Sequence, residues 1–319
     1  MQKNNSQVSF SSEELNSNLV ILLYHGVTDA KSIGIENFSG KHISANEFER
    51  QMFFIKKNCN VLSLDDIVEI HRNNDKWPKN SVAVTFDDGF KNNYTTAVPI
   101  LKRLNIPATF YVCSGMIESN KMFWVDKIED SINFTDLKKI RILLESNTDF
   151  ELDSKDKRIF AVSEIKKFCK KVDVNSKERV LNSLKDLTKI EPKPSNAKNY
   201  EMLSWDDLKS INDDPLFTIG CHTLYHDIMS SHNDEKRMFR DVELSIGLLE
   251  FNLNENIIHY SYPEGQKNDY NQRVIDKLKE SKIVCSPSAI HGINPHHTDI
   301  FNLFRIMPGF MGMPFPYDS

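Results

Sequence analysis

The chain has 319 residues, 39% of them hydrophobic, and its 40 Lys and Arg residues against 45 Asp and Glu residues give a formal net charge of −5. This length and hydrophobic content are sufficient for a large buried core. The acidic balance, without a long basic run, argues against a nucleic-acid partner. The five cysteines are scattered without CxxC spacing, which indicates reduced, mostly buried thiols and excludes a disulfide scaffold.

The first 18 residues are polar where a signal peptide needs an apolar core, and no apolar run approaches the ~18 residues of a membrane span. We therefore expect a cytoplasmic protein. Residues 1–18 are expected to form a polar N-terminal segment, and residues 311–319 a C-terminal tail.

Three apolar runs in the first third of the chain have the composition of buried strands. The run LVILLY (19–24) ends at His25, SVAVTF (81–86) ends at two aspartates and a glycine, and ATFYVC (108–113) follows a helical pattern over 94–104. Strand, helix and strand in this order predict parallel pairing.

The alternation is lost over residues 114–203. Segments such as KRIFAVSEIKKFCKKV and DLKKIRILLES have charged faces and helical spacing, so we expect an all-helical insertion whose charges face solvent. Trp124 and Asp126 come at its start, and two interpretations stay open for them: packing against the rim of the main domain, or contact with substrate.

The alternation resumes at Trp205 and continues almost to the end of the chain. We expect helices from about 205, over 234–251 and over 271–281, and strands over 216–221, 257–262, 283–286 and 301–307. Repeated strand–helix units predict a parallel α/β barrel formed by residues 19–113 and 204–310, with an open doubly wound sheet as the alternative.

Asp87 and Asp88 stand where the central strand stops. Neighbouring side chains at a strand end diverge, so the two carboxylates are expected to have different surroundings and different tasks, one holding a cation and the other moving protons. The alternative is an ordinary Asp-Gly turn that closes a hairpin.

Other polar residues also follow apolar runs, namely His25, His222 and the sequence Pro263-Glu264-Gly265. Because the carboxyl ends of parallel strands share one face, these groups are expected to meet Asp87 and Asp88 there.

His222 and His226 are four residues apart. If the segment forms a helical turn, both imidazoles reach one ion, and a carboxylate oxygen of Asp88 completes a facial triad. Chance spacing of surface histidines is the alternative.

These motifs together resemble the polysaccharide deacetylases, carbohydrate esterases with a NodB homology domain. The sequence TFDDG stands at 85–89, HTxxH at 222–226 and PxG at 263–265, and LLYHGV and DIFNLFRI open and close the region of similarity. The resemblance implies a distorted (β/α)7-type barrel, with the helical insertion left unassigned.

It further implies a metal-dependent hydrolase that removes an N-acetyl or N-formyl group from an amino sugar of a glycan or glycan precursor. Asp88, His222 and His226 would hold a divalent metal, most often Zn²⁺, and Asp87 would be the base that activates a metal-bound water. The substrate and oxyanion contacts would come from Tyr262, Pro263, Glu264 and Gly265.

The sequence departs from the family pattern in two places. Ser261 stands where the family commonly has the arginine that orients the base, and we predict that Arg305 supplies that guanidinium, with an ordinary arginine at the surface or core edge as the alternative. The late histidine motif that usually provides the general acid is absent, and we predict His25 for this role, with His297 in reserve.

An N-acylated amino sugar or saccharide is the expected partner, with peripheral membrane contact if that substrate is lipid-linked. A catalytically impaired saccharide-binding barrel with a structural metal is the alternative. A metallophosphatase is disfavoured because two histidines and one aspartate supply too few ligands for a two-metal site.

Overall fold

The computed structural model describes residues 10–231 and 234–315. The helices are α1 (Ser12–Ser17), α2 (Ala45–Asn58), α3 (Leu64–Asn73), α4 (Val98–Leu104), α5 (Trp124–Phe134), α6 (Lys155–Cys169), α7 (Val174–Thr188), α8 (Trp205–Asn212), α9 (Glu235–Leu253), α10 (Gln272–Glu280) and α11 (Pro308–Met311). The strands are β1 (Val20–Tyr24), β2 (Gly26–Thr28), β3 (His42–Ser44), β4 (Asn60–Val61), β5 (Ser81–Phe86), β6 (Ala108–Val112), β7 (Lys139–Leu143), β8 (Asn147–Glu151) and β9 (Phe217–Cys221).

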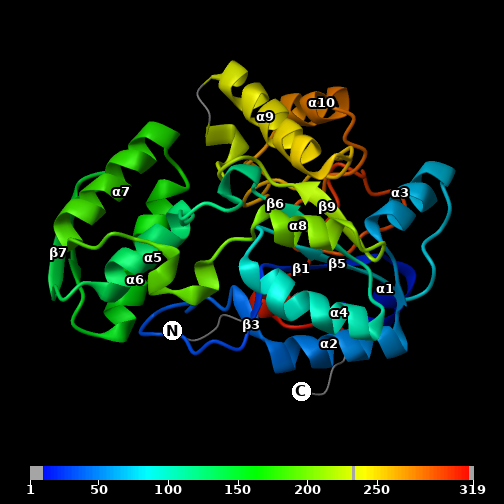
Figure 1. Cartoon of the computed structure of the whole chain (residues 1–319), viewed down its shortest axis with the longest axis horizontal. Helices are drawn as coiled ribbons and strands as arrows, with labels where there is room; N and C mark the ends of the chain where they lie inside the picture. The colour runs from blue at the N-terminus through cyan, green and yellow to red at the C-terminus, as the bar shows by residue number, and fades with distance from the viewer. Residues whose placement is uncertain (1–9, 232–233, 316–319) are drawn as a thin grey trace.

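The main sheet is parallel, as the strand–helix order predicts, and its strands are ordered β1-β5-β6-β9, with the short β4 also paired to β5. The register places Tyr24 beside Phe86, and Val112 beside Cys221. The carboxyl ends of these strands therefore lie at the same edge, which positions the residues that follow them. Figure 1 shows α2 and α4 together beside one part of this sheet and α9 and α10 beside another.

Backbone bridges continue the pairing beyond β9 and return it to β1. Cys221 pairs with Tyr260 and His259 with Cys285, while His291 pairs with Arg305 and Leu22 with Ile306. Hydrogen bonds from Ser286 to Ile300 and from Ser288 to Leu303 join the last segments. The ring closes, so the fold is a distorted (β/α)7-type barrel and the open sheet is excluded.

The late strands are shorter than the sequence predicts. The predicted strands 257–262, 283–286 and 301–307 appear only as single bridges within the described chain. Pro263 follows the first and Pro287 follows the second, and proline has no N–H to donate to a ladder.

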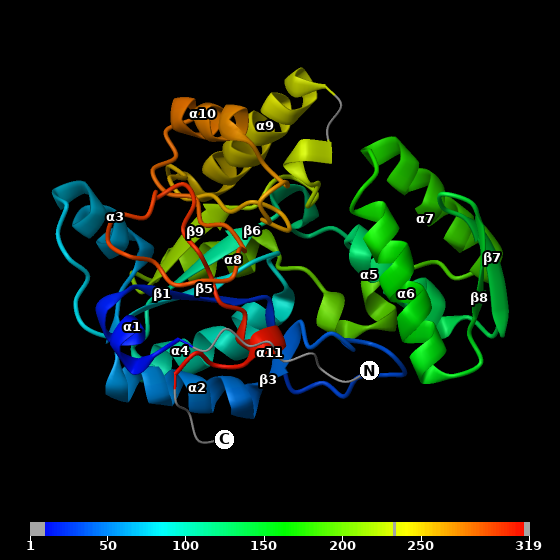
Figure 2. The ribbon, with the colours of Figure 1, turned by 180° about the vertical axis from the view of Figure 1, so that it is seen from behind.

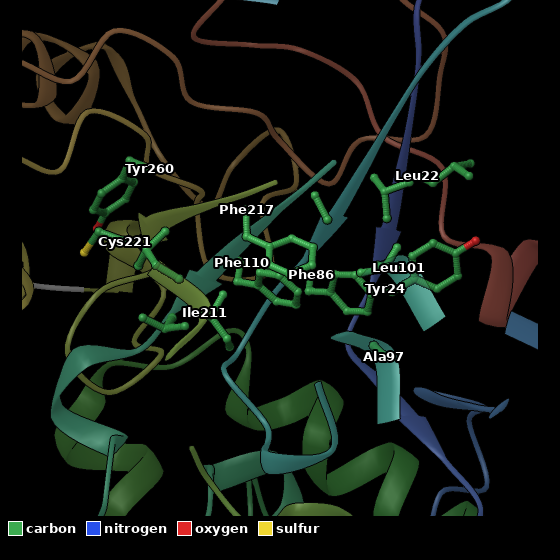
Figure 3. Close-up of a cluster of buried hydrophobic side chains, with 14 of the residues drawn as sticks. Leu22, Tyr24, Phe86, Ala97, Leu101, Phe110, Ile211, Phe217, Cys221 and Tyr260 are labelled. Carbon is green, nitrogen blue, oxygen red and sulfur yellow. The ribbon is translucent and has the colours of Figure 1, made fainter. Parts of the chain in front are cut away.

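The barrel strands are buried on both faces, which explains their nearly continuous apolar sequences. In β1, Val20 and Leu22 pack into the largest hydrophobic cluster, whereas Ile21 points to a separate cluster with Leu303. Figure 3 shows the first cluster, in which Phe86 and Phe110 of adjacent strands lie side by side. Their rings stack at a centroid separation of 4.9 Å.

The insertion is not all helical, which corrects the sequence prediction. Strands β7 and β8 pair antiparallel as a hairpin, with Ile140 opposite Phe150. Along β7 the exposed Lys139 and Arg141 alternate with the buried Ile140 and Ile142, a period of two that fits a half-buried strand. The charged residues of this stretch had suggested a helix.

Helices α5, α6 and α7 pack with this hairpin around a hydrophobic cluster of their own, which includes Ile128, Ile165 and Leu184. Figures 1 and 2 show these elements grouped to one side of the barrel. The boundaries 114 and 203 stay a prediction.

The predicted N-terminal segment and C-terminal tail lie partly outside the described residues. The part of the first that is described contains α1, whose Leu15 is buried. All five cysteines are free thiols and four of them are buried, as predicted. Within the described ranges, no helix combines the length and apolarity needed to cross a membrane.

Candidate active site

A left-handed turn at the end of β5 separates Asp87 from Asp88. Asp88 has φ 79° and Gly89 has φ 88°, a region that costs little for glycine but strains most other residues. The turn is fixed because the Asp87 N–H donates to the Tyr24 carbonyl at 2.9 Å and the Cys113 N–H donates to the Asp88 carbonyl at 3.3 Å. The two carboxyl groups accordingly meet different partners, as the sequence predicts.

Asp87 is held by Arg305. The guanidinium donates from Nη1 to Oδ1 at 2.8 Å and from Nη2 to Oδ2 at 2.7 Å. Arg305 is fully buried, and its Nε donates to the Ser288 carbonyl at 2.6 Å. Burial by itself raises the pKa of Asp87, but the charges of Arg305 and His222 more than offset it, and the pKa lies below its usual value. Asp87 is therefore an ionised carboxylate of fixed orientation.

Ser261, which stands at the family's usual arginine position, contacts a histidine. Its hydroxyl lies 2.7 Å from Nδ1 of His222 and its carbonyl oxygen lies 2.8 Å from the same atom. A hydrogen bond from Nδ1–H to the carbonyl leaves Nε2 of His222 with a free lone pair. The same hydroxyl is 3.4 Å from Oδ1 of Asp87.

Asp88, His222 and His226 form a buried cluster whose ligand atoms all lie within 4.8 Å of one another. Nε2 of His226 is 3.4 Å from Oδ1 of Asp88, and Nε2 of His222 is 3.8 Å from it. That Oδ1 atom is buried and has no hydrogen-bond partner. Two imidazole nitrogens and an unpaired carboxylate oxygen are a donor set that suits a zinc-like divalent ion, so the residues present fit the metal.

The electrostatics of Asp88 also favour a cation. Burial raises the pKa of Asp88 to about 7, and the adjacent Asp87 charge adds to this, although Lys41 and His222 oppose it. A buried carboxylate that lacks compensation is stabilised when a cation binds beside it.

The HTxxH segment is an irregular turn, which corrects the expected helical turn. No helix covers 222–228. Instead Thr223 and His226 have φ values of 68° and 61°. The Thr223 hydroxyl accepts a hydrogen bond from the His226 N–H at 3.0 Å. The turn brings both rings together with centroids 5.1 Å apart.

The predicted substrate loop lies beside this cluster. Tyr262 and Glu264 line the same cavity as the aspartates. Glu264 and Gly265 both have φ 59°, and the Gly265 N–H donates to the Pro263 carbonyl at 2.7 Å. A Cβ on Gly265 would lie 2.6 Å from the Ala289 nitrogen, so glycine is needed for this tight turn.

The two histidines considered for the general acid are separated by the fold. His25 lines the cavity, and burial lowers its pKa to about 3 although the Asp87 charge opposes this. His297 is exposed and is not among the residues that line the cavity. The fold therefore brings His25, and not His297, to the candidate site.

The cavity has a volume of about 500 Å³ and lies between the barrel and the insertion. Its wall on the insertion side carries Val125, Asp126, Glu129, Lys166 and Lys170. From the sequence, contact of Asp126 with substrate stayed open, while Glu129, Lys166 and Lys170 were missed because charged residues on amphipathic helices are usually solvated. Val125 was missed because no motif distinguishes it.

Lys41 also lines the cavity and was not identified from the sequence. Its Nζ donates to Oδ1 of Asp126 at 2.6 Å. Lys41 lies in the loop before β3, a region in which no motif distinguishes it from other lysines.

Comparison with known proteins shows the family to which the chain is similar. The family model for polysaccharide deacetylase matches residues 74–283. A poly-beta-1,6-N-acetyl-D-glucosamine N-deacetylase of Staphylococcus aureus (strain MSSA476) is 33% identical over 95 residues, which are 30% of this chain and 31% of that protein. The protein of the same name from Staphylococcus epidermidis (strain ATCC 35984) is 25% identical over 181 residues, 56% of this chain and 59% of that protein. The chain thus matches less than two thirds of the length of either relative.

Solved structures share the fold. The Streptococcus pyogenes deacetylase PplD in complex with acetate matches with a TM-score of 0.58 at 16% identity, covering 92% of each chain. IcaB from Ammonifex degensii matches with a TM-score of 0.57 at 15% identity, covering 93% of this chain and 98% of that one. With its family model matched over most of its length, this chain belongs to the polysaccharide deacetylase family.

Proposed function

We propose that this protein is a metal-dependent hydrolase that removes the N-acetyl group from an amino sugar of a glycan or glycan precursor. One observation carries the proposal: the buried cluster of Asp88, His222 and His226 lies at the same cavity as Asp87, and Asp87 is held ionised by Arg305. The names of the staphylococcal relatives support N-acetylated glucosamine units as the substrate.

Amide hydrolysis needs an activated water and a polarised acyl oxygen. Asp88, His222 and His226 would hold a divalent ion such as Zn²⁺, which would supply a lowered pKa for the water and polarisation of the carbonyl. Asp87 takes the proton of the attacking water, since its carboxylate is ionised and its two oxygens are fixed by Arg305.

His25 delivers a proton to the departing amine in this proposal. The imidazole is neutral in the free protein because burial lowers its pKa to about 3. The proton that Asp87 takes from the water is passed on to His25, whose pKa rises as negative charge develops on the acyl oxygen, and His25 gives this proton to the amine as the C–N bond breaks. The loop with Tyr262 and Glu264 contacts the saccharide.

The alternative of a catalytically impaired saccharide-binding barrel with a structural metal loses much of its support. It rested partly on Ser261 at the usual arginine position, yet Arg305 makes the two-pronged contact with the base. A binding protein has no need of an ionised carboxylate oriented in this way.

The experiment is acetate release from a β-1,6-linked N-acetylglucosamine trimer by the zinc-loaded wild type and by Asp87→Asn. Asparagine keeps the size of the side chain and removes the base, so the rate should fall by about 10²-fold or more while zinc content is unchanged. Equal rates in the two proteins would overturn the assignment of the base. An inactive wild type would overturn the proposed function.

A further inference from the structure

The insertion is fastened to the loops that carry the candidate site. Lys170, just after α6, pairs with Glu264 at 2.5 Å, and Lys177 of α7 pairs with Asp227 at 2.6 Å. Asp227 directly follows His226, and the side chain of Lys177 is 5% exposed. The wall that the insertion contributes to the cavity is thus held in a fixed position relative to the metal cluster.

Asp126 of α5 belongs to this wall, and one of its carboxylate oxygens has no partner. The residue is 1% exposed and lines the cavity. Its Oδ1 atom accepts from Nζ of Lys41 at 2.6 Å, whereas its buried Oδ2 atom has no hydrogen-bond partner. Lys41 is itself fixed, because its Nζ lies 4.7 Å from the ring centroid of Phe90 and 4.9 Å from that of Tyr200.

The other charged groups on the insertion wall are already engaged. Oε1 of Glu129 accepts from the Tyr200 hydroxyl and from the Asn37 N–H, and its Oε2 accepts from Lys166 at 3.2 Å. Lys170 is bound to Glu264. Among the described residues of this wall, Oδ2 of Asp126 is therefore the carboxylate oxygen that lacks a hydrogen-bond donor.

A buried carboxylate oxygen without a hydrogen-bond donor lowers the stability of the folded protein, because its desolvation is not compensated. A ligand that donates a hydrogen bond to this oxygen provides the compensation. A saccharide brings hydroxyl groups, which donate hydrogen bonds to carboxylate oxygens. We propose that Asp126 binds a sugar hydroxyl of the substrate through Oδ2, which makes the insertion part of the substrate site and a determinant of its specificity. This inference rests on the proposed function for the identity of the ligand.

The substitution Asp126→Asn tests this contact without removing the bond to Lys41. The lysine ammonium only donates, so the amide turns its oxygen toward Lys41 and its NH₂ group toward the cavity. An acceptor is thereby replaced by a donor at the position of Oδ2. The matched control is Asp156→Asn, which changes the same charge at an exposed position of α6 in the same insertion.

Steady-state acetate release is measured with the β-1,6-linked N-acetylglucosamine trimer and with its 3-deoxy and 4-deoxy analogues. For Asp126→Asn we expect KM to rise about tenfold with kcat within about twofold, since a contact made equally in ground and transition states is lost. In the wild type one deoxy analogue should show the same loss, and in Asp126→Asn that analogue should be equivalent to the trimer. Asp156→Asn should match the wild type.

Two outcomes overturn the inference: KM of Asp126→Asn equal to that of the wild type, or deoxy analogues that lose affinity equally in both proteins. The second outcome would assign Asp126 a purely structural role. To separate this failure from failure of the proposed function, trimer binding is also measured by calorimetry in Asp87→Asn and in the Asp87→Asn/Asp126→Asn double variant. A wild type without turnover refutes the hydrolase, while equal binding in these two variants refutes the Asp126 contact.

Discussion

Arg305 and Asp87 are 218 residues apart in sequence and form a fully buried, two-pronged ion pair with N–O distances of 2.8 and 2.7 Å. The pair joins the last segment of the barrel to the end of β5. In the family pattern, an arginine at the position of Ser261 is expected to contact the base; here Arg305 makes that contact with Asp87. Ser261 instead supports His222. Asp87 and His222, the proposed base and a proposed metal ligand, are thus oriented by different segments of the chain.

Arg305→Lys keeps the charge but loses the planar fork that grips both oxygens of Asp87. We expect acetate release to fall by about 10- to 100-fold, the usual cost of removing a partner that orients a site residue, with zinc content unchanged. Arg273→Lys, at a side chain that is 71% exposed, is the control. Full activity in Arg305→Lys would show that the fork does not orient the base.

If Asp88, His222 and His226 bind zinc, substitution of any one of them should lower the zinc content of the protein. Asp88→Ala and His222→Ala each remove one of the three proposed metal ligands, so bound zinc should fall from about one ion per chain to a trace after dialysis. Elemental analysis of the purified proteins measures this. His291→Ala, outside the cavity lining, should retain the wild-type content, and retention of zinc in the two cluster variants would place the metal elsewhere.

Asp241 on α9 makes stability depend on pH. Burial raises its pKa to about 7 from the usual 3.8, and the Asp227 charge adds to this while the hydrogen bond from the Leu224 N–H opposes it. Since the folded-state pKa is the higher one, the folded protein binds the proton more tightly. The contribution of Asp241 to the free energy of unfolding should therefore be greatest below about pH 4. This contribution should decrease as the pH rises toward and through 7.

Asp241→Asn keeps an acceptor for Leu224 and removes this titration. At pH 8 the free energy of unfolding of this variant should exceed that of the wild type by on the order of 2 kcal/mol. Near pH 4 the two free energies should be equal. Urea unfolding at both pH values gives the measurement, and Asp186→Asn, at an exposed position of α7, is the control. A constant offset at both pH values would contradict the assignment.

The ion pair between Lys177 and Asp227 should matter for stability more than a surface pair does. Lys177 is nearly buried and also lies over the Trp124 ring at 5.2 Å. Lys177→Met should lower the free energy of unfolding by about 2 kcal/mol because Asp227 loses its partner in a partly buried setting. Lys185 of the same helix forms an exposed pair with Glu191 and offers a control, since Lys185→Met should cost less than about 0.5 kcal/mol. Equal effects would show that Lys177 does not fasten the insertion.

The sequence was sufficient to locate the early strands and the polar groups that follow them. Runs such as SVAVTF are dense in β-branched residues and end at recognisable turns, so β5 and Asp87 were predicted at their observed positions. The face shared by Asp88 and His222 followed from parallel topology alone.

Other features depended on information that short patterns do not contain. The turn at 222–226 requires positive φ at Thr223 and His226, which neither residue type signals. The pair of Lys41 and Asp126 forms across 85 positions, and distance in sequence conceals such contacts. The hairpin of β7 and β8 was missed because the charged residues of β7 suggested the solvent-facing side of a helix. The alternation of charged and apolar residues with a period of two was overlooked.

The most direct test of the account is acetate release from the β-1,6-linked N-acetylglucosamine trimer by metal-free protein titrated with zinc. We expect no release without metal and a rate that rises in proportion to added zinc until about one ion per chain is bound. A metal-free protein as active as the zinc-loaded one, or a zinc-loaded protein that releases no acetate, would contradict it.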